Sequence, residues 1–523
     1  MRWWAWPLTG ILLYAAWPGS PLTMLLLAAW VPLLLQERQC STARFFWLAW
    51  LSMLLWNLGT TWWIWNASPP GAVGAIVANS LLMCFPLMAF RFTRRHAGEV
   101  LGYSSLPLYW ISFEYLHHQW DLSWPWLTLG NGLANSTSFV QWYAYTGTTG
   151  GTLWLWVANV LVLGSLLQWP WLKSRTGLAL RLLLIMGPLI TSGFILRWQP
   201  LASTNATTNV VVVQPNVEPY TEKFNTPADT LVARLISQSE AAIDSNTRLL
   251  VWPETAIPAQ AWEHRLAENE TFQPVYAMLA RHPQLLLVTG IDSYRYWGST
   301  NPGGMSSRQM SDGSYYEAFN TAMGASAGQP PALYHKSKLV PGVEGLPSWL
   351  GFMGSLFDDF GGISGSLGKS DSAMVLRQPG NPYQPAPIIC YESIYSDYTT
   401  DYVRRGANIL TVITNDGWWG NTPGYRQHLS MSRLRAIENR QWVLRSANTG
   451  ISCIISPTGQ VLQQLGWNER GVLKAAIPPA TGTSFYSRYG DWLSRLCWPL
   501  AGLLLAWALY KRLLARRAPT PSV

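Results

Sequence analysis

Long apolar runs dominate the amino-terminal part of the chain. They lie at about residues 3–17, 21–35, 45–63, 71–90, 100–116, 152–171 and 177–196, and a further run lies at about 493–510. A transmembrane helix needs about 20 consecutive, mostly apolar residues, and several of these runs are shorter. The pattern predicts a polytopic α-helical membrane domain with about eight spans, whose limits are approximate.

Between residues 197 and 491 the pattern changes to short apolar runs separated by polar stretches. Strands are expected at Val210–Val213, Leu249–Trp252, Gln284–Val288, Thr321–Met323 and Ile409–Ile413, and again within 450–477. Helices are expected at 226–244 and 424–446. Alternation of strand and helix signals is typical of an α/β domain.

The composition also indicates a membrane protein with more than one domain. Of the 523 residues, 49% are hydrophobic and 12% are charged, whereas soluble proteins carry about 25% charged residues. The 32 tryptophans are expected mainly at membrane interfaces, where indole rings are favoured. A chain of this length exceeds what one hydrophobic core usually supports.

The positions of Lys and Arg predict the orientation in the membrane. If the amino terminus is cytoplasmic, the inside loops and tail contain Arg38, Arg44, Arg91, Arg94, Arg95, Lys173, Arg175, Arg181, Lys511, Arg512, Arg516 and Arg517. The outside loops near 18–20, 64–70 and 117–151 contain neither residue type. The positive-inside rule then places 197–491 outside the cytoplasmic membrane.

Three parts are therefore expected. Residues 1–196 form a transmembrane domain of about seven helices, residues 197–491 an external catalytic domain, and residues 492–523 a transmembrane helix with a basic cytoplasmic tail. The net charge of +9 follows mostly from this topology. No basic patch interleaved with stacking aromatics is present, so no nucleic-acid partner is expected.

The cysteine count excludes a disulfide scaffold. Only Cys390 and Cys453 fall within 197–491, which is too few to staple a domain of this size. Cys453, in an apolar run, is expected in a buried strand. No Cys/His spacing indicates zinc and no glycine motif is suited to phosphate, so no cofactor or metal is expected.

Cys390 is the candidate nucleophile. Ile388 and Ile389 lead straight into it, and a helix-compatible polar segment, Ser393–Arg405, follows and closes at Gly406. This pattern predicts a strand, a sharp turn and a helix, with the thiol presented at the turn. Taken alone, a small buried residue at a strand end is the better interpretation, since free cysteine is often buried.

Glu254 and Lys336 change that judgement, because each follows a strand-like run or a turn. Side chains at the carboxyl ends of strands can converge on one crevice of an α/β sheet. Glu254 is suited to accept the thiol proton, and Lys336 to favour thiolate and stabilise an oxyanion. Cys390 is suited to attack a carbonyl carbon.

These motifs resemble two nested families. The order Pro253-Glu254, then Tyr-x-Lys-x-x-Leu-Val-Pro at 334–341, then Cys-Tyr-Glu at 390–392 resembles the nitrilase superfamily. The last tripeptide, together with 415–420, 427–433 and 445–450, resembles the apolipoprotein N-acyltransferase family of bacterial membrane enzymes. The resemblance runs from about 208 to about 492 and implies a four-layer αββα sandwich with a Glu254-Lys336-Cys390 triad.

The resemblance also implies roles for neighbouring residues. Glu344 would orient Lys336 or move protons, although the loop before it, Val340-Pro-Gly-Val, departs from the family pattern. Tyr391 and Glu392 would support the thiol. An aromatic residue expected after the first strand would be Phe224 or Tyr220. The substrate-binding candidates are Phe224, Trp349, Trp418 and Trp419, and the apolar, glycine-rich stretch 345–363 is expected to meet lipid.

The implied reaction is a ping-pong acyl transfer without a cofactor. A phospholipid, with phosphatidylethanolamine as the expected donor, would acylate Cys390. The amino-terminal diacylglyceryl-cysteine of an apolipoprotein would then accept the chain, which completes lipoprotein maturation. Two alternatives stay open here: a membrane-anchored nitrilase-type amidase that hydrolyses a small amide, and a non-enzymatic membrane scaffold.

Overall fold

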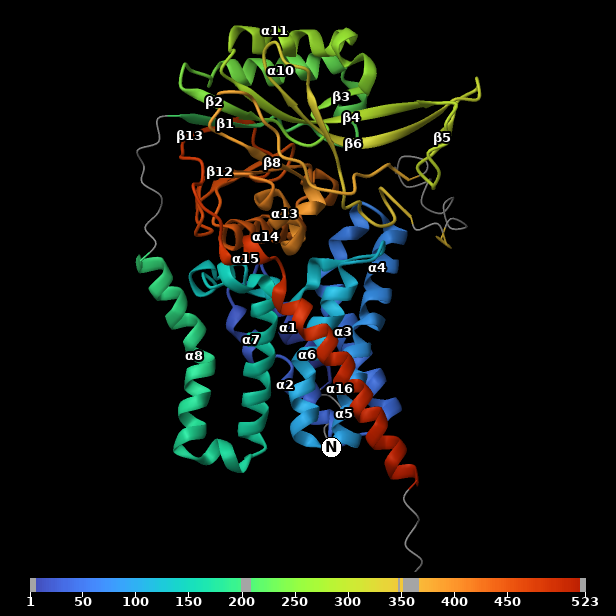
Figure 1. Ribbon diagram of the computed structural model, residues 1–523, viewed down its shortest axis with the longest axis vertical. Coiled ribbons are helices and arrows are strands. Elements are labelled where there is room, and N and C mark those ends of the chain that lie inside the picture. The colour runs from blue at the N-terminus through green and yellow to red at the C-terminus, as the bar shows by residue number, and fades with distance from the viewer. Residues whose placement is uncertain (1–5, 199–207, 347–348, 351–365, 518–523) are drawn as a thin grey trace, which may run out of the picture. The chain divides into compact units, whose positions relative to one another are not determined.

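The computed structural model describes residues 6–198, 208–346, 349–350 and 366–517 (Figure 1). The chain divides into two compact units. The first, called here the helical unit, consists of Met1–Trp62, Ala72–Ile195 and Asp491–Val523. The second, called the sheet unit, consists of Trp63–Gly71 and Leu196–Gly490.

Within the described residues, each apolar run expected to span the membrane contains one or more helices. The helices are α1 (Trp6–Ala15), η2 (Thr23–Leu27), α2 (Val31–Glu37), α3 (Thr42–Thr61), α4 (Pro69–Leu82), α5 (Cys84–Ala97), α6 (Glu99–His117), α7 (Tyr143–Leu166), α8 (Arg175–Trp198) and α16 (Trp492–Arg517). Among the described residues, 4 segments are long and apolar enough to cross a membrane by themselves: Pro69–Ala97, Tyr143–Leu166, Arg175–Trp198 and Trp492–Arg516.

The second apolar run is broken between η2 and α2, and Asn159 of α7 satisfies the backbone there. The Trp30 N–H donates to Asn159 Oδ1 at 2.8 Å, and Asn159 Nδ2 donates to the Leu26 carbonyl at 2.8 Å. Backbone polar groups freed by a helix break inside a membrane protein need such partners. The break is therefore a buried, hydrogen-bonded feature of the helical unit.

Several tryptophans form the core of the helical unit instead of an interfacial belt. Trp30, Trp56, Trp110 and Trp156 are fully buried. The ring centroid of Trp30 lies 4.5 Å from that of Trp156 and 4.7 Å from that of Trp110. The expectation that indoles gather mainly at interfaces is therefore wrong for these four, which pack edge to face or tilted as buried aromatics prefer.

The sheet unit contains two mixed sheets. The 8-stranded sheet has the order β13-β1-β2-β4-β6-β5, with β3 paired to β4 and β7 to β6. Its strands are β1 (Asn209–Gln214), β2 (Thr247–Val251), β3 (Ile257–Trp262), β4 (Leu286–Gly298), β5 (Arg308–Gln309), β6 (Tyr315–Ala325), β7 (Ala332–His335) and β13 (Gly471–Ala476). The 5-stranded sheet has the order β12-β11-β10-β9-β8. Its strands are β8 (Pro385–Ile389), β9 (Ile409–Thr414), β10 (Val443–Ala447), β11 (Ser452–Ile455) and β12 (Val461–Leu465).

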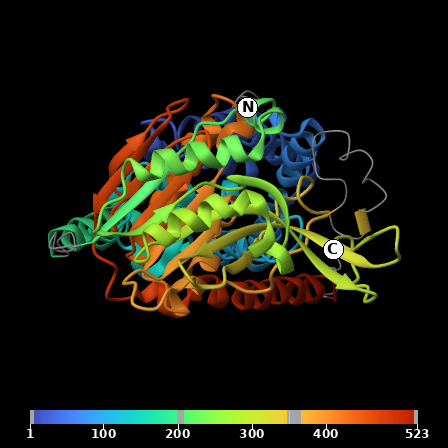
Figure 2. The same cartoon turned by 90° about the horizontal axis from the view of Figure 1, so that it is seen from above.

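Helices cover the outer faces of both sheets, which gives the expected αββα sandwich. In Figures 1 and 2, α10 (Ala228–Glu240) and α11 (Gln273–Arg281) lie over the larger sheet, and α13 (Ser396–Arg404) and α14 (Pro423–Asn439) lie beyond the smaller one. One apolar core lies between the sheets and includes Val288 and Cys390. A second core lies under α10 and α11 and includes Leu287 and Ile291.

The structure corrects two details of the sequence prediction and confirms a third. The helix expected at 424–446 ends at Asn439, because Arg440 adopts a left-handed conformation (φ 52°) and Val443–Ala447 is strand β10. The strands expected at 284–288 and 321–323 are the buried parts of a long antiparallel hairpin, β4 and β6. Cys453 is a buried residue of β11, as expected.

Candidate active site

The turn that carries Cys390 is as sharp as the sequence predicted. Strand β8 ends at Ile389, a 3-10 turn covers Cys390–Ile394, and α13 follows. Cys390 itself has a φ of 47°, in the left-handed region that non-glycine residues rarely adopt. Such strain in a nucleophile's turn is typical of a side chain held out from the end of a sheet.

Glu254 lies just past the end of β2, where the chain turns tightly. Thr255 has a φ of 43°, and β4 passes so close that a Cβ on Gly290 would lie 2.3 Å from the Thr255 nitrogen. Only glycine fits at this crossing. The Glu254 carboxylate, 7% exposed, is held from the opposite sheet by the Asn415 N–H, which donates to Oε2 at 3.0 Å.

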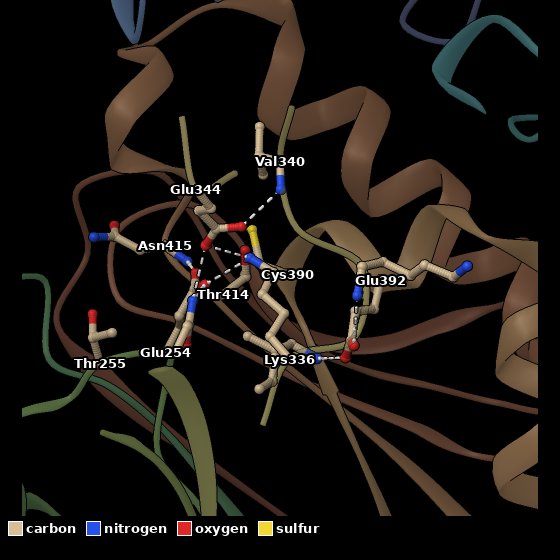
Figure 3. A network of polar contacts seen from close by, with 12 residues as sticks. Glu254, Thr255, Lys336, Val340, Glu344, Cys390, Glu392, Thr414 and Asn415 are labelled. Atoms are coloured by element: carbon tan, nitrogen blue, oxygen red, sulfur yellow. Dashed lines mark hydrogen bonds and ion pairs between the residues drawn. The ribbon is translucent and has the colours of Figure 1, made fainter. Parts of the chain in front are cut away.

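Lys336 follows β7 and is buried between two carboxylates (Figure 3). Its Nζ lies 2.8 Å from Glu344 Oε1 and 3.4 Å from Glu254 Oε1. The other oxygen of Glu344 accepts the Val340 N–H at 2.8 Å. The loop from Lys336 to Glu344 thus closes on itself, despite its unusual Pro-Gly-Val sequence.

Asn320, in the middle of β6, completes this set and was not anticipated from the sequence. Its Nδ2 donates to Glu254 Oε1 at 2.8 Å and to Glu344 Oε1 at 3.0 Å. Glu254, Asn320, Lys336 and Glu344 are called the Lys336 cluster below. A polar residue inside an apolar strand pattern was the available signal, because a buried amide needs polar partners.

Electrostatics keep the lysine charged and the thiol protonated. Burial by itself lowers the pKa of Lys336, but the Glu344 and Glu254 carboxylates outweigh it and hold this pKa above its ordinary value. Burial raises the pKa of the Cys390 thiol and Glu254 raises it further, while Lys336 acts in the opposite direction. A thiol in this state needs a base to take its proton when it reacts.

Glu392 connects the Cys390 turn to β7 and to the loop after β7 that carries Lys336 (Figure 3). Its Oε1 accepts the Ser337 N–H at 2.7 Å and the Tyr334 hydroxyl at 2.6 Å, and its Oε2 accepts the Ile389 N–H at 2.8 Å. It is fully buried. Tyr391, next to Cys390, is also buried, and its ring packs edge to face on Tyr395.

A second buried charged set lies behind the Cys390 turn. Asp416, His428 and Arg445, called the Asp416 cluster below, are all fully buried. Asp416 Oδ1 lies 2.9 Å from His428 Nδ1, and Asp416 Oδ2 pairs with the Arg445 guanidinium. His428 Nε2 lies 2.7 Å from Ser393 Oγ and 3.2 Å from the Cys390 carbonyl oxygen. Through His428 this cluster contacts the backbone and a side chain of the Cys390 turn.

Similar proteins match this chain over the helical unit as well as the sheet unit. The chain is 34% identical over 521 residues to the apolipoprotein N-acyltransferase of Chlorobaculum tepidum, covering 97% of this chain and 96% of the relative. It is 28% identical over 525 residues to that of Azotobacter vinelandii, covering 96% and 93%. The family model for the apolipoprotein N-acyltransferase N-terminal domain matches residues 9–161, and the carbon-nitrogen hydrolase model matches 209–486. The chain belongs to the apolipoprotein N-acyltransferase family.

The family resemblance stated from the motifs is thereby confirmed, together with the nitrilase-like fold of the sheet unit. Among solved structures, a mutant amidase of the nitrilase superfamily from Nesterenkonia is 19% identical, with a TM-score of 0.37. That likeness covers 57% of this chain and 99% of the amidase.

The aromatic residues expected to bind substrate in this apolipoprotein N-acyltransferase family member differ in their surroundings. Trp418 and Trp419 lie partly exposed in the turn after Asn415, and the Trp418 carbonyl accepts the Tyr220 hydroxyl at 2.7 Å. Trp349 is 63% exposed. The side chain of Phe224, and residues 347–348 and 351–363 of the apolar stretch, lie outside what the structure describes. In the described residues no group of three or more His, Cys, Asp or Glu is arranged to hold a metal.

Proposed function

We propose that this chain transfers an acyl chain from a membrane phospholipid to the α-amino group of an apolipoprotein's amino-terminal diacylglyceryl-cysteine. The observation that carries the proposal is the relationship to the apolipoprotein N-acyltransferase of Chlorobaculum tepidum, which extends over 97% of the chain. The geometry of the Lys336 cluster beside Cys390 supports the chemistry. Phosphatidylethanolamine is the proposed donor.

In the first half of the reaction, Cys390 would attack the ester carbonyl carbon of the phospholipid. Glu254 would take the thiol proton as the C–S bond forms. The ester C–O bond would then break, and Glu254 would return the proton to the leaving oxygen, which departs as lysophospholipid. This role for Glu254 is supported by the raised pKa of Cys390, which leaves little free thiolate at neutral pH.

Lys336 and the backbone N–H of Tyr391 are proposed to stabilise the oxyanion of each tetrahedral intermediate. The pKa of Lys336 is held up by Glu344 and Glu254, so the ammonium remains charged throughout. Glu344 and Asn320 would orient Lys336 and Glu254, and Glu392 would fix the Cys390 turn relative to the lysine strand. In the second half, the acceptor amine would attack the thioester and regenerate the thiol.

Labelled phospholipid and a synthetic diacylated lipopeptide test this proposal with the purified protein. The expected result is a labelled, triacylated lipopeptide and an acyl adduct on Cys390 when the lipopeptide is omitted. The amidase alternative predicts release of a small carboxylic acid from an amide and no labelled lipopeptide. The match of the family model for the apolipoprotein N-acyltransferase N-terminal domain to residues 9–161 favours the acyltransferase.

The topology proposal keeps the boundaries 1–196, 197–491 and 492–523, with 197–491 on the periplasmic side of the inner membrane. A protease added to spheroplasts should cleave the exposed loop around Asn301–Gly304 and leave the tail after Lys511 intact. Protection of this loop in intact spheroplasts would show that the orientation is the opposite of the one proposed.

A further inference from the structure

Strand β4 presents a carboxylate to the candidate active site that none of the roles above uses. Val288 belongs to the core between the two sheets, which also contains Cys390, whereas Leu287 and Ile291 lie in the core under α10 and α11. Side chains alternate between faces along a strand. Gly290 and Asp292 therefore face the same side as Val288, toward the sheet that carries Cys390.

The strand register places Asp292 beside the Lys336 cluster. Its partner on the antiparallel strand β6 is Asn320, and the Cβ atoms of such a pair lie about 4.5–5.5 Å apart. Asn320 Nδ2 contacts both Glu254 and Glu344. Gly290, two residues before Asp292, lies against the backbone of Glu254 and Thr255.

The electrostatics of Asp292 agree with this position. Burial raises its pKa, the nearby Lys223 ammonium lowers it, and the Glu254 and Glu344 carboxylates raise it. Asp292 therefore lies within electrostatic reach of both glutamates.

The cations in this region are already engaged. The Lys336 ammonium is shared by Glu344 and Glu254, and the Lys223 ammonium donates to the Thr255 hydroxyl. In the parts of the chain that the structure describes, no hydrogen bond or ion pair holds the Asp292 carboxylate, and its side chain is only partly buried. The three carboxylates of Asp292, Glu254 and Glu344 thus have only two ammonium groups near them, those of Lys336 and Lys223. One more cation could be bound here.

We infer that Asp292 binds the ammonium group of the acyl acceptor and orients its nitrogen toward the thioester. The inference rests on the proposed acyl transfer and adds a specificity-determining residue to it. The bound ammonium gives one proton to Glu254, and its nitrogen attacks the thioester carbonyl carbon. The C–S bond then breaks, the second proton passes to the Cys390 sulfur, and Glu254 releases its proton to solvent. The products are an amide and the free thiol.

The position of Asp292 favours the acceptor amine over the headgroup of the donor. Asp292 is the strand partner of Asn320, whose amide donates to Glu254. A cation bound by Asp292 therefore lies near the group proposed to deprotonate the nucleophile. The ammonium of a phosphatidylethanolamine headgroup is separated from the reacting ester by the phosphate and glycerol. A headgroup contact would act on acylation of Cys390, whereas an acceptor contact acts on the second half alone.

Separate measurement of the two half-reactions tests this inference with full-length protein in detergent. Acylation is followed by mass spectrometry of Cys390 after mixing with phosphatidylethanolamine or, as a donor without an amine, phosphatidylglycerol. Transfer is followed after addition of a diacylated lipopeptide with a free α-amine or, as a neutral nucleophile, hydroxylamine. The variants are Asp292→Asn, Asp292→Glu and, as the control, Asp371→Asn, which removes an exposed carboxylate elsewhere in the sheet unit.

For Asp292→Asn we expect the rate of acylation by either donor to stay within about twofold of wild type, and the same holds for release of the acyl chain by hydroxylamine. The rate of transfer to the lipopeptide should fall about tenfold to a hundredfold, because a hydrogen bond to a charged group is lost. Asp292→Glu should recover part of the transfer rate, and Asp371→Asn should match wild type.

Normal transfer by Asp292→Asn would overturn the inference. So would an equal loss with hydroxylamine, or slower acylation confined to phosphatidylethanolamine, which would assign Asp292 to the headgroup. If Asp292→Asn does not fold, Asp292→Glu decides the question. Transfer by Asp292→Glu at the full rate of the control Asp371→Asn, with no change in acceptor KM, would then overturn the inference. Absence of any acyl adduct on wild-type Cys390 would instead contradict the acyl-enzyme and hence the proposed function.

Discussion

Two buried charged clusters flank the Cys390 turn, and they differ in how their charges balance. In the Asp416 cluster each carboxylate oxygen has its own partner, His428 or Arg445, and all three side chains are fully buried. In the Lys336 cluster Glu254 and Glu344 share one ammonium, and Glu254 keeps some exposure.

This difference suits the Asp416 cluster to holding the backbone of the turn and the Lys336 cluster to its proposed part in the reaction. Burial tends to raise the pKa of Asp416, yet Arg445 and His428 hold it below its ordinary value, so that carboxylate stays ionised in a fixed ion pair. Around Lys336, by contrast, two carboxylates have a single ammonium between them. A closed, balanced pair fixes geometry, whereas an unbalanced one beside a thiol is suited to proton transfer.

The largest effect should come from removing the thiol on which the Lys336 cluster acts. Cys390→Ala is expected to reduce acyl transfer to background with little change in thermal stability, because only a sulfur atom at a strand end is lost. Incorporation of labelled acyl chain into lipopeptide measures this. Cys453→Ala, in buried strand β11, is the control and should retain activity. Transfer by Cys390→Ala at the wild-type rate would exclude the proposed chemistry.

Glu254→Gln should slow acylation of Cys390 and at the same time make the Cys390 thiolate easier to form. The amide cannot accept a proton, so acyl-enzyme formation should fall about 10²–10⁴-fold, the usual contribution of general base catalysis. Because Glu254 also raises the pKa of Cys390, the same variant should be alkylated by iodoacetamide faster than wild type at neutral pH. Mass spectrometry of the Cys390 peptide reports both rates. A normal acyl adduct, or slower alkylation, would contradict the role given to Glu254.

Arg445→Met should break the balanced cluster and act on stability first. It leaves Asp416 as a buried charge without its main partner, which typically costs about 3–5 kcal/mol. We expect a clearly lower Tm in detergent, followed by loss of activity as the Cys390 turn loosens. Adding Asp416→Asn should recover part of the Tm, because the uncompensated charge is then removed. A wild-type Tm for Arg445→Met would show that the Asp416 cluster does not hold the turn.

The smallest effect is expected at Asn320, which sharpens the contrast within the Lys336 cluster. Asn320→Ala removes the amide that donates to both glutamates. Because loss of a hydrogen bond to a charged group lowers a rate by about tenfold to a hundredfold, the acylation rate should fall by that amount. Single-turnover acylation of Cys390 measures the change. Asn301→Ala, in an exposed turn, provides the control. An unchanged acylation rate would show that Asn320 does not orient the two glutamates for the reaction.

The sequence predicted the parts of the site that follow strand ends. Glu254, Lys336 and Cys390 each stand where an apolar run stops and polar residues begin, and the structure brings the first two into contact and the third beside them. Asn320 and Asp292 lie inside long strands whose apolar pattern was recognised only in part. Their role depends on which strands pair, and pairing between distant segments leaves no local mark.

The helix limits failed for a related reason. The helix expected to reach residue 446 stops at Asn439, because the left-handed Arg440 ends it without the glycine or proline that usually signals a stop. By contrast, the alternating strand and helix patterns predicted an α/β domain, and the family resemblance supplied the αββα layering. Local pattern was sufficient for the fold class, and tertiary contacts set the details.

The separation of the reactive groups between two sheets has a consequence for biosynthesis. Glu254 and Lys336 follow strands of the larger sheet, and Cys390 follows a strand of the smaller one. The larger sheet is completed only when β13, near the end of the sheet unit, pairs with β1 at its beginning. All strands of the sheet unit are therefore present only after Gly471–Ala476 has been synthesised. On the proposed mechanism, an unfinished chain would then present Cys390 without the complete sheet unit in which it is proposed to be acylated.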